Sequence, residues 1–131
     1  MRIIKLDYLV YQKRKSPIIP VALFGRKEWK ITWVYVDSGA SYSIFSTEDA
    51  HRLGLNLSEG ERISMVVGDG GHIPVYLFKL PLKIEDVTIE ATIGFSPRLG
   101  VGFNLLGRKD VFERFKICFD DRQGVLTFVR R

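Results

Sequence analysis

One short segment near residue 37 sets the strongest limit on how this chain can fold. The run Val34-Tyr35-Val36 leads directly into Asp37-Ser38-Gly39-Ala40. β-Branched and aromatic residues favour extended strands, in which Val34 and Val36 share one face and Tyr35 takes the other. Gly39 permits a tight turn and a close approach of the backbone to a ligand. The segment therefore predicts a strand that ends at an aspartate held on a Ser-Gly turn.

A second segment, far along the chain, has the character of a packing partner for the first. It reads Asn104-Leu105-Leu106-Gly107-Arg108, an apolar pair followed by glycine and arginine. An apolar pair of this kind is typical of a buried strand. We expect it to pack beside the strand that carries Asp37.

An aspartate at the end of a buried strand can act in acid–base chemistry when a second carboxylate lies next to it. Two carboxylates in contact share one proton, because both cannot ionise so close together. One takes a proton from water while the other polarises a carbonyl group. The chain has one apolar-apolar-Asp-Ser/Thr-Gly segment, since Asp69-Gly70-Gly71 has no hydroxyl residue after its aspartate. If the chain is catalytic, the second aspartate must therefore come from another copy, and we expect a C2 homodimer with Asp37 of both chains at the axis.

Length and composition indicate one globular domain over residues 1–131. Hydrophobic residues make up 46% of the chain and charged residues 27%. No apolar run approaches the ~18 residues that span a membrane, and the start of the chain has no signal-peptide character. Cys118 is the single cysteine, so no intrachain disulfide is expected and the cytoplasm is the predicted location.

The net charge of +5 raises the alternative of a basic nucleic-acid module. Its cations cluster in Lys13-Arg14-Lys15, Arg26-Lys27 and Arg130-Arg131, which are turn-like or terminal positions where solvated charge is expected. We therefore predict no nucleic-acid partner and no membrane partner. His51 and His72 are far apart without nearby metal-ligand spacing, and phosphate-loop and serine-elbow motifs are missing from the sequence.

Short apolar runs separated by turns predict a mostly β chain of the sandwich or barrel type. Strands are expected at residues 3–10, 18–24, 29–36, 62–67, 73–80, 87–95, 116–119 and 125–129, with a polar turn at 12–16. Pro81 is expected to lie beyond the end of its strand. Ser46 is a helix N-cap followed by acids, which predicts a short helix at 47–53. Apolar residues on one face predict a second short helix at 109–115.

With these features the chain resembles the retropepsin-like aspartic proteases, the single-domain homodimeric type found in retroviruses and in some cellular proteins. The resemblance covers residues 17–129 and has three segments in the right order. They are Tyr35-Val36-Asp37-Ser38-Gly39-Ala40, Gly68-Asp69-Gly70-Gly71-His72-Ile73 and Asn104-Leu105-Leu106-Gly107-Arg108. The resemblance implies an all-β, closed barrel-like acid-protease fold with one or two short helices and a flap hairpin.

The resemblance also implies a function and a set of site residues. The function is a homodimeric aspartic endopeptidase, active at acidic to mildly acidic pH, which uses no cofactor or metal and prefers large hydrophobic residues at the scissile bond. Asp37 would be the catalytic residue, in an active-site loop with Ser38, Gly39 and Ala40. The other implied residues are Gly68, Asp69, Gly70 and Gly71 in the flap, Tyr35, Phe103 and Leu105 in substrate pockets, and Gly107 and Arg108 in the structural signature.

Two positions depart from the family pattern. Retroviral enzymes usually have an acidic residue four positions after the catalytic aspartate, which pairs with the signature arginine. Ser41 occupies that position here, which leaves the partner of Arg108 open. Asp69 stands in the flap where viral enzymes have an apolar residue, and it would either disfavour closure or select a basic substrate residue. These departures favour an alternative, a catalytically silent dimer that binds peptides or assembles a partner protein.

Overall fold

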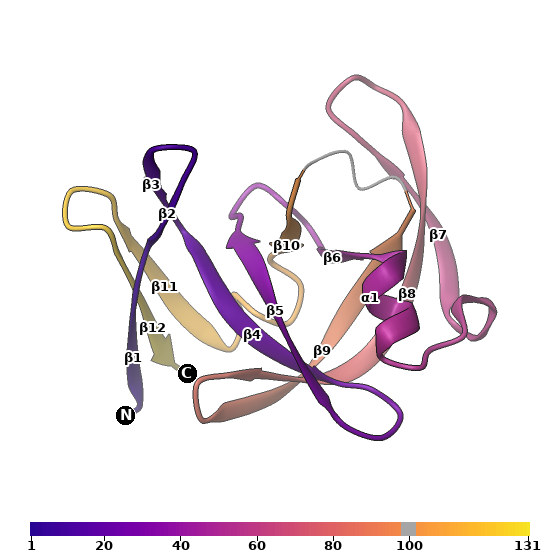
Figure 1. The fold of residues 1–131 in the computed structure, drawn as a ribbon, viewed down its shortest axis with the longest axis horizontal. Helices are drawn as coiled ribbons and strands as arrows, with labels where there is room; N and C mark the ends of the chain where they lie inside the picture. Colours follow the sequence, from indigo (N-terminus) through magenta and orange to yellow (C-terminus); the bar gives the residue numbers. More distant parts are fainter. Residues whose placement is uncertain (98–101) are drawn as a thin grey trace.

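The fold is built almost entirely from strands, in a computed structural model that describes residues 1–97 and 102–131 (Figure 1). The strands are β1 (Ile3–Asp7), β2 (Leu9–Tyr11), β3 (Arg14–Ser16), β4 (Ile18–Phe24), β5 (Trp29–Val36), β6 (Ser43–Ser46), β7 (Glu61–Val66), β8 (His72–Ile84), β9 (Val87–Ser96), β10 (Asn104–Leu106), β11 (Phe115–Asp120) and β12 (Val125–Arg130). The α-helix α1 (Thr47–Arg52) and the 3₁₀ helix η1 (Leu57–Glu59) complete the fold. The all-β prediction with one or two short helices is confirmed.

Seven strands form one sheet that closes on itself. Their order is β4-β5-β10-β6-β9-β8-β7, and β4 also pairs with β8 through Ala22 and Leu23. β7 is the end strand of this order, so it stays at the edge of the sheet, outside the ring that the β4–β8 pairing closes. Side chains such as Phe45, Phe95 and Leu106 are fully buried inside. This arrangement fits the expected barrel-like fold.

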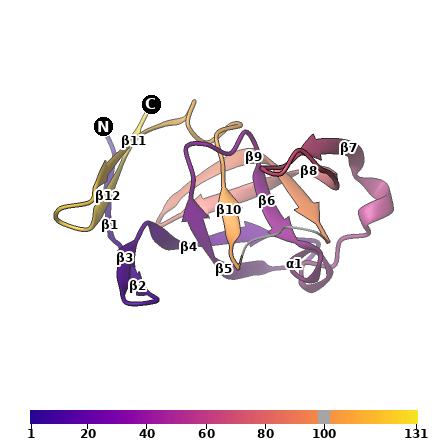
Figure 2. The same cartoon turned by 90° about the horizontal axis from the view of Figure 1, so that it is seen from above.

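A smaller sheet lies at one end of the molecule, opposite the end that carries α1 (Figure 2). It has three antiparallel strands in the order β1-β12-β11. Phe115 and Phe128 from this sheet are buried and belong to the same apolar cluster as the residues inside the barrel. Burial of aromatic rings on both sides joins the two sheets into one core. Among the described residues, no helix is long and apolar enough to cross a membrane.

The elements with strong local signals form where the sequence places them. β4 and β5 match the predicted ranges, and Val34 and Val36 are almost fully buried on one face of β5. The helix begins after Ser46, whose Oγ accepts a hydrogen bond from the Asp49 N–H at 3.2 Å. This is the expected N-cap.

The first predicted strand is divided in two, which corrects one expectation. β1 and β2 are separated by Tyr8, a buried residue whose hydroxyl donates a hydrogen bond to Asp121 at 2.7 Å. Burial, together with this carboxylate acceptor, raises the pKa of Tyr8 above its usual range. The polar turn expected at 12–16 is also wrong in its second half, because residues 14–16 form β3 and pair with β2.

Two more expectations are corrected further along the chain. Residues 109–114 form turns and Phe115 begins β11, in place of the helix expected at 109–115, because Asp110 has a left-handed backbone with a φ of 66°. The strand expected to end before Pro81 continues to the end of β8. Pairing of β8 with β7 ends at Leu77 and its pairing with β4 begins at Leu82, so Pro81 lies where that side needs no N–H donor.

Candidate active site

The loop that carries Asp37 is held by a strand inserted between its two flanking strands. β5 enters the loop and β6 leaves it, while β10 lies between them, parallel to β5 and antiparallel to β6. Leu105 of β10 is level with Tyr35 on one side and Ile44 on the other. The Asp37 N–H donates a hydrogen bond to the Leu106 carbonyl at 3.0 Å. The expected packing of the second segment beside the aspartate strand is confirmed.

The carboxylate of Asp37 is oriented by its own turn. Its Oδ1 accepts a hydrogen bond from the Gly39 N–H at 2.8 Å, and its carbonyl accepts one from the Ala40 N–H at 3.2 Å. The Arg108 N–H donates to the Ala40 carbonyl at 2.9 Å, which ties the loop to the chain beyond β10. Asp37 is half-buried and Ser38 is exposed. The turn thus presents a carboxylate to solvent in a fixed orientation.

The signature glycine lies where the two segments approach most closely. The Gly107 N–H donates to the Oγ of Ser43, a fully buried serine, at 3.0 Å. A Cβ at Gly107 would overlap the carbonyl group of Tyr42 and would come within 2.8 Å of the Ala40 carbonyl oxygen. No larger residue fits without displacing the aspartate loop. The sequence analysis did not single out Ser43, which has no positional signal beyond being a small polar residue beside an apolar one.

A buried amide joins four elements beneath the loop. Asn104 of β10 donates from Nδ2 to Thr32 Oγ1 at 3.1 Å and to Asp49 Oδ2 at 2.7 Å. Its Oδ1 accepts from the Ser46 N–H at 3.0 Å. These bonds connect β10 with β5, β6 and α1, and they satisfy the polar atoms of a side chain that is 9% exposed. Sequence reasoning placed Asn104 in the second segment but gave it no role.

A hollow of about 430 Å³ opens beside Asp37. Its lining residues are Lys15, Pro17, Tyr35, Val36, Asp37, Ser38, Phe119 and Asp121. Asp121 is the other carboxylate in this lining, but one of its oxygens accepts the Tyr8 hydroxyl. It follows β11 in a turn without the Ser-Gly sequence that supports Asp37. Lys15, Phe119 and Asp121 were not predicted to lie near the site.

The three residues predicted for substrate pockets lie in two places. Tyr35 lines the hollow beside Asp37, and Leu105 is its neighbour on β10. Phe103, at the start of β10, packs edge-to-face against Tyr11 with ring centroids 4.4 Å apart. Phe103 and Leu105 do not line the hollow itself. Tyr11 was not predicted, because its hairpin was not recognised in the sequence.

The segment predicted as a flap tip joins β7 to β8 in a long hairpin that stands out from the body of the molecule (Figure 1). The end of β5 points to the same side of the molecule (Figure 1). Gly68, Asp69, Gly70 and Gly71 are all exposed. Asp69 Oδ1 accepts a hydrogen bond from the Gly71 N–H at 2.8 Å, so its carboxylate closes the turn of the hairpin. This contact gives Asp69 a local role in shaping the tip.

Arg108 lies on the surface beside Ser41. Together with Tyr42, Lys109, Phe112 and Glu113, these residues line a hollow of about 370 Å³. Within residues 1–97 and 102–131, the Arg108 side chain makes no ion pair. Ser41 accepts a backbone hydrogen bond from the Lys109 N–H at 2.9 Å instead. Backbone hydrogen bonds therefore connect this segment to the Asp37 loop.

Comparison with solved structures identifies the fold as retropepsin-like. A retropepsin-like aspartic protease from Rickettsia conorii matches with a TM-score of 0.69 and 19% identity, over 97% of this chain and 98% of that chain. EIAV protease, solved in complex with the inhibitor HBY-793, matches with a TM-score of 0.55 and 20% identity, over 76% of this chain and 88% of that chain. The expected retropepsin fold is confirmed.

The sequence itself gives the family. A family model described as aspartyl protease matches residues 19–108, which include the Asp37 loop, the β7–β8 hairpin and the Asn104–Leu106 strand. The chain belongs to this aspartyl protease family and is an aspartic-type peptidase. Comparison with curated proteins gives no match.

Proposed function

We propose that this protein is a homodimeric aspartic endopeptidase whose catalytic pair is Asp37 of one chain and Asp37 of a second copy. The observation that carries the proposal is the solvent-facing, oriented carboxylate of Asp37 on a turn fixed by β10. Asp121 is a poor intrachain partner because the Tyr8 hydroxyl already occupies it. A twofold axis beside the loop would bring two equivalent carboxylates together.

In the assembled site the two carboxylates would share one proton. The ionised carboxylate would take a proton from the attacking water, and the protonated one would polarise the scissile carbonyl. The Gly39 N–H bond to Oδ1 keeps the Asp37 carboxylate in one orientation throughout. Ser38 is exposed on the turn and would brace the loop of the second copy. A singly protonated pair favours activity at acidic to mildly acidic pH.

Substrate would bind as an extended strand between the aspartate loops and the two β7–β8 hairpins. Exposed backbone at Gly68, Gly70 and Gly71 can approach a peptide without side-chain interference. Tyr35, Phe103 and Leu105 give the neighbourhood of the loop an apolar and aromatic character, which favours large hydrophobic residues around the scissile bond. The 97% and 98% coverage in the Rickettsia conorii comparison supports residues 1–131 acting as one domain. The exposed free thiol of Cys118 suits a reducing cytoplasm.

The test compares the two carboxylates that line the hollow. Asp37→Asn should reduce peptidase activity by about 10²- to 10⁴-fold, because the amide cannot act as acid or base. Asp121→Asn keeps an acceptor for Tyr8 and should retain activity. Activity per chain should also fall on dilution, in step with the fraction of dimer measured by sedimentation. Loss of activity in both variants would indicate a catalytic pair within one chain, and a fully active monomer would contradict the dimer.

Arg108 is exposed and makes no ion pair within the part of the chain that the structure describes, which favours a second candidate, a dimer that binds peptides without cleaving them. Retroviral enzymes of the type that this chain resembles usually have an acidic residue at the position that pairs with this arginine, whereas here it is Ser41. Tight binding of extended apolar peptides with no cleavage from acidic to neutral pH would support this candidate. Cleavage that Asp37→Asn removes would exclude it.

A further inference from the structure

We propose that the β2–β3 hairpin is a basic side wall of the substrate cleft and selects peptides with an acidic residue, Asp or Glu, away from the scissile bond. The inference rests on the proposed function, because it assigns specificity to the same site. Its basis is the position of the hairpin, the geometry of its turn and the charge that the turn carries.

The hairpin is attached to the site by an aromatic contact. Tyr11 of β2 packs edge-to-face on Phe103 with ring centroids 4.4 Å apart. A Cβ at Gly102 would lie 3.7 Å from the Tyr11 hydroxyl, so the hairpin also approaches the backbone before Phe103. Gln12 donates to the same hydroxyl at 3.3 Å. The contact places a surface hairpin against the segment that continues as Leu105 beside the Asp37 loop.

The turn of the hairpin holds side chains where glycine is favoured. Gln12 and Lys13 have φ angles of 50° and 66°, the left-handed values of a two-residue turn in which Asn-Gly is typical. Residues other than glycine are strained at such backbone angles, and strain of this kind clusters at functional sites. Arg14 pairs in register with Tyr11, so both lie on one face of the hairpin. The Tyr11 ring on that face contacts Phe103.

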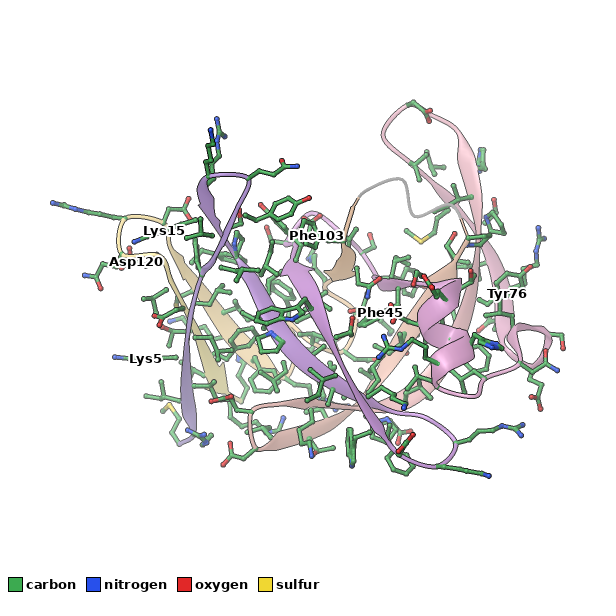
Figure 3. The ribbon with its side chains drawn as sticks, in the orientation of Figure 1. Lys5, Lys15, Phe45, Tyr76, Phe103 and Asp120 are labelled. Carbon is green, nitrogen blue, oxygen red and sulfur yellow. The ribbon has the colours of Figure 1, made fainter. Side chains whose placement is uncertain are left out.

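Three cations follow one another around this turn. Lys13, Arg14 and Lys15 are exposed, and none of them makes an ion pair with a described residue. Lys15 lines the hollow beside Asp37, and in Figure 3 it lies on the same side of the molecule as Asp120, the last residue of β11. Asp121 lines the same hollow, and its charge, which the hydrogen bond from the Tyr8 hydroxyl does not remove, offsets that of Lys15. Lys13 and Arg14, which make no ion pair with a described residue, therefore supply the positive charge that would attract an acidic peptide side chain.

The experiment measures binding separately from cleavage. Full-length Asp37→Asn protein is titrated with fluorescent peptides that have a central Phe-Phe pair and one Glu or Gln at successive positions on either side. At about pH 6 the glutamate is ionised. At one or more positions the Glu peptide should bind about 3- to 10-fold more tightly than its Gln twin, as expected for a few solvent-exposed ion pairs. Equal affinity at every position would overturn the proposal.

Matched variants locate the source of the preference. Lys13→Gln with Arg14→Gln, added to Asp37→Asn, should bring the Glu/Gln ratio close to one. Lys27→Gln with Lys79→Gln removes the same charge from exposed positions in the β4–β5 turn and in β8, and should leave the ratio unchanged. An unchanged Glu/Gln affinity ratio in the Lys13 and Arg14 variant, or an equal fall of the ratio in both variants, would show that the hairpin does not select the acidic residue.

A third pair of variants tests the aromatic attachment. Tyr11→Ala keeps every cation but removes the ring contact with Phe103, and it should lower the Glu/Gln ratio by at least half. Tyr11→Phe keeps the ring and should retain the ratio. Cleavage of the same peptides by the unmodified protein is scored independently. Selective binding without cleavage would remove the peptidase proposal and keep the hairpin, whereas cleavage without selectivity would do the reverse.

Discussion

Two turns of this molecule have almost the same local structure in different surroundings. In the Asp37 loop, Asp37 Oδ1 accepts a hydrogen bond from the Gly39 N–H at 2.8 Å. At the tip of the β7–β8 hairpin, Asp69 Oδ1 accepts one from the Gly71 N–H, also at 2.8 Å. Both are turns in which an aspartate bonds the backbone two residues on. Local chemistry alone does not distinguish them.

The difference lies in what surrounds each turn. The Asp37 loop receives backbone bonds from β10 and the segment after it, through Leu106 and Arg108. At the hairpin tip, a Cβ added to Gly68 or Gly70 would find nothing within 4 Å. A turn held from several sides can orient a reacting group, whereas a turn with few contacts opens and closes at low free energy. Tertiary contacts, and not the Asp-Xaa-Gly sequence, therefore distinguish the two turns.

The first substitutions add one methyl group at Gly107, which packs against the Asp37 loop, and one at Gly68 in the hairpin tip. Gly107→Ala should destabilise the fold by about 3 kcal/mol, because its Cβ would overlap backbone carbonyl groups that cannot move independently. Gly68→Ala, at the open tip, should change stability by less than about 0.5 kcal/mol. Urea unfolding of the two variants measures both values. Equal destabilisation would show that the two turns are constrained alike and would break the comparison.

A smaller effect is expected from the buried amide that supports the Asp37 loop. Asn104→Ala removes three hydrogen bonds and leaves the Ser46 N–H without its acceptor, which should reduce stability by about 2 kcal/mol. Asn56→Ala removes the exposed cap of η1, which accepts from Ser58, and should cost about 0.5–1 kcal/mol. Thermal or urea unfolding compares them. A loss at Asn104 no larger than that at Asn56 would mean that the loop does not depend on this network.

The sequence predicts those parts of the fold whose signals are local. The alternation of β5, the Ser46 cap and the hairpin of β11 and β12 are all readable from neighbouring residues, and each is confirmed. β6 is different because it exists through pairing with β10 and β9, both far away in the sequence. The helix expected at 109–115 fails because Asp110 takes a left-handed backbone there, which apolar spacing does not reveal. Tertiary context overrides local preference at these points.

The same difference between local signals and long-range contacts applies to the candidate site. Asp37 and Gly107 stand in short motifs and are found by reading the chain. Asn104 and Ser43 are not, because their partners are set by which strands become neighbours. The β2–β3 hairpin was hidden for another reason, since its turn uses Gln12 and Lys13 where turn-favouring residues are expected. Residues that support a site through long-range contacts therefore remain beyond a single sequence.

The smallest effect in this series is a pH dependence in the segment that follows Arg108. Asp110 Oδ2 accepts a hydrogen bond from the Thr92 N–H at 2.8 Å. Partial burial acts to raise the pKa of Asp110, but the Thr92 hydrogen bonds and the cations Lys109 and Arg114 outweigh it and hold the pKa below its usual range. Because the folded pKa is the lower one, ionised Asp110 stabilises the fold above about pH 4, and this contribution is lost as pH falls through the lowered pKa.

Asp110→Asn tests this dependence, because it keeps an acceptor for Thr92 while removing the charge. At pH 7 the variant should be less stable than the parent protein by less than about 1 kcal/mol, since the carboxylate is only partly buried. The gap should close as the pH falls through the lowered pKa, below which both proteins are uncharged at this position. Asp69→Asn, the same change at the open turn, should shift stability by less than about 0.5 kcal/mol at pH 7. Urea unfolding across this pH range measures both differences in stability. A difference for Asp110→Asn that widens toward acid would contradict the predicted direction of the pH dependence. An equal difference for Asp69→Asn would show that the charge of Asp110 adds no stability beyond that of an exposed turn aspartate.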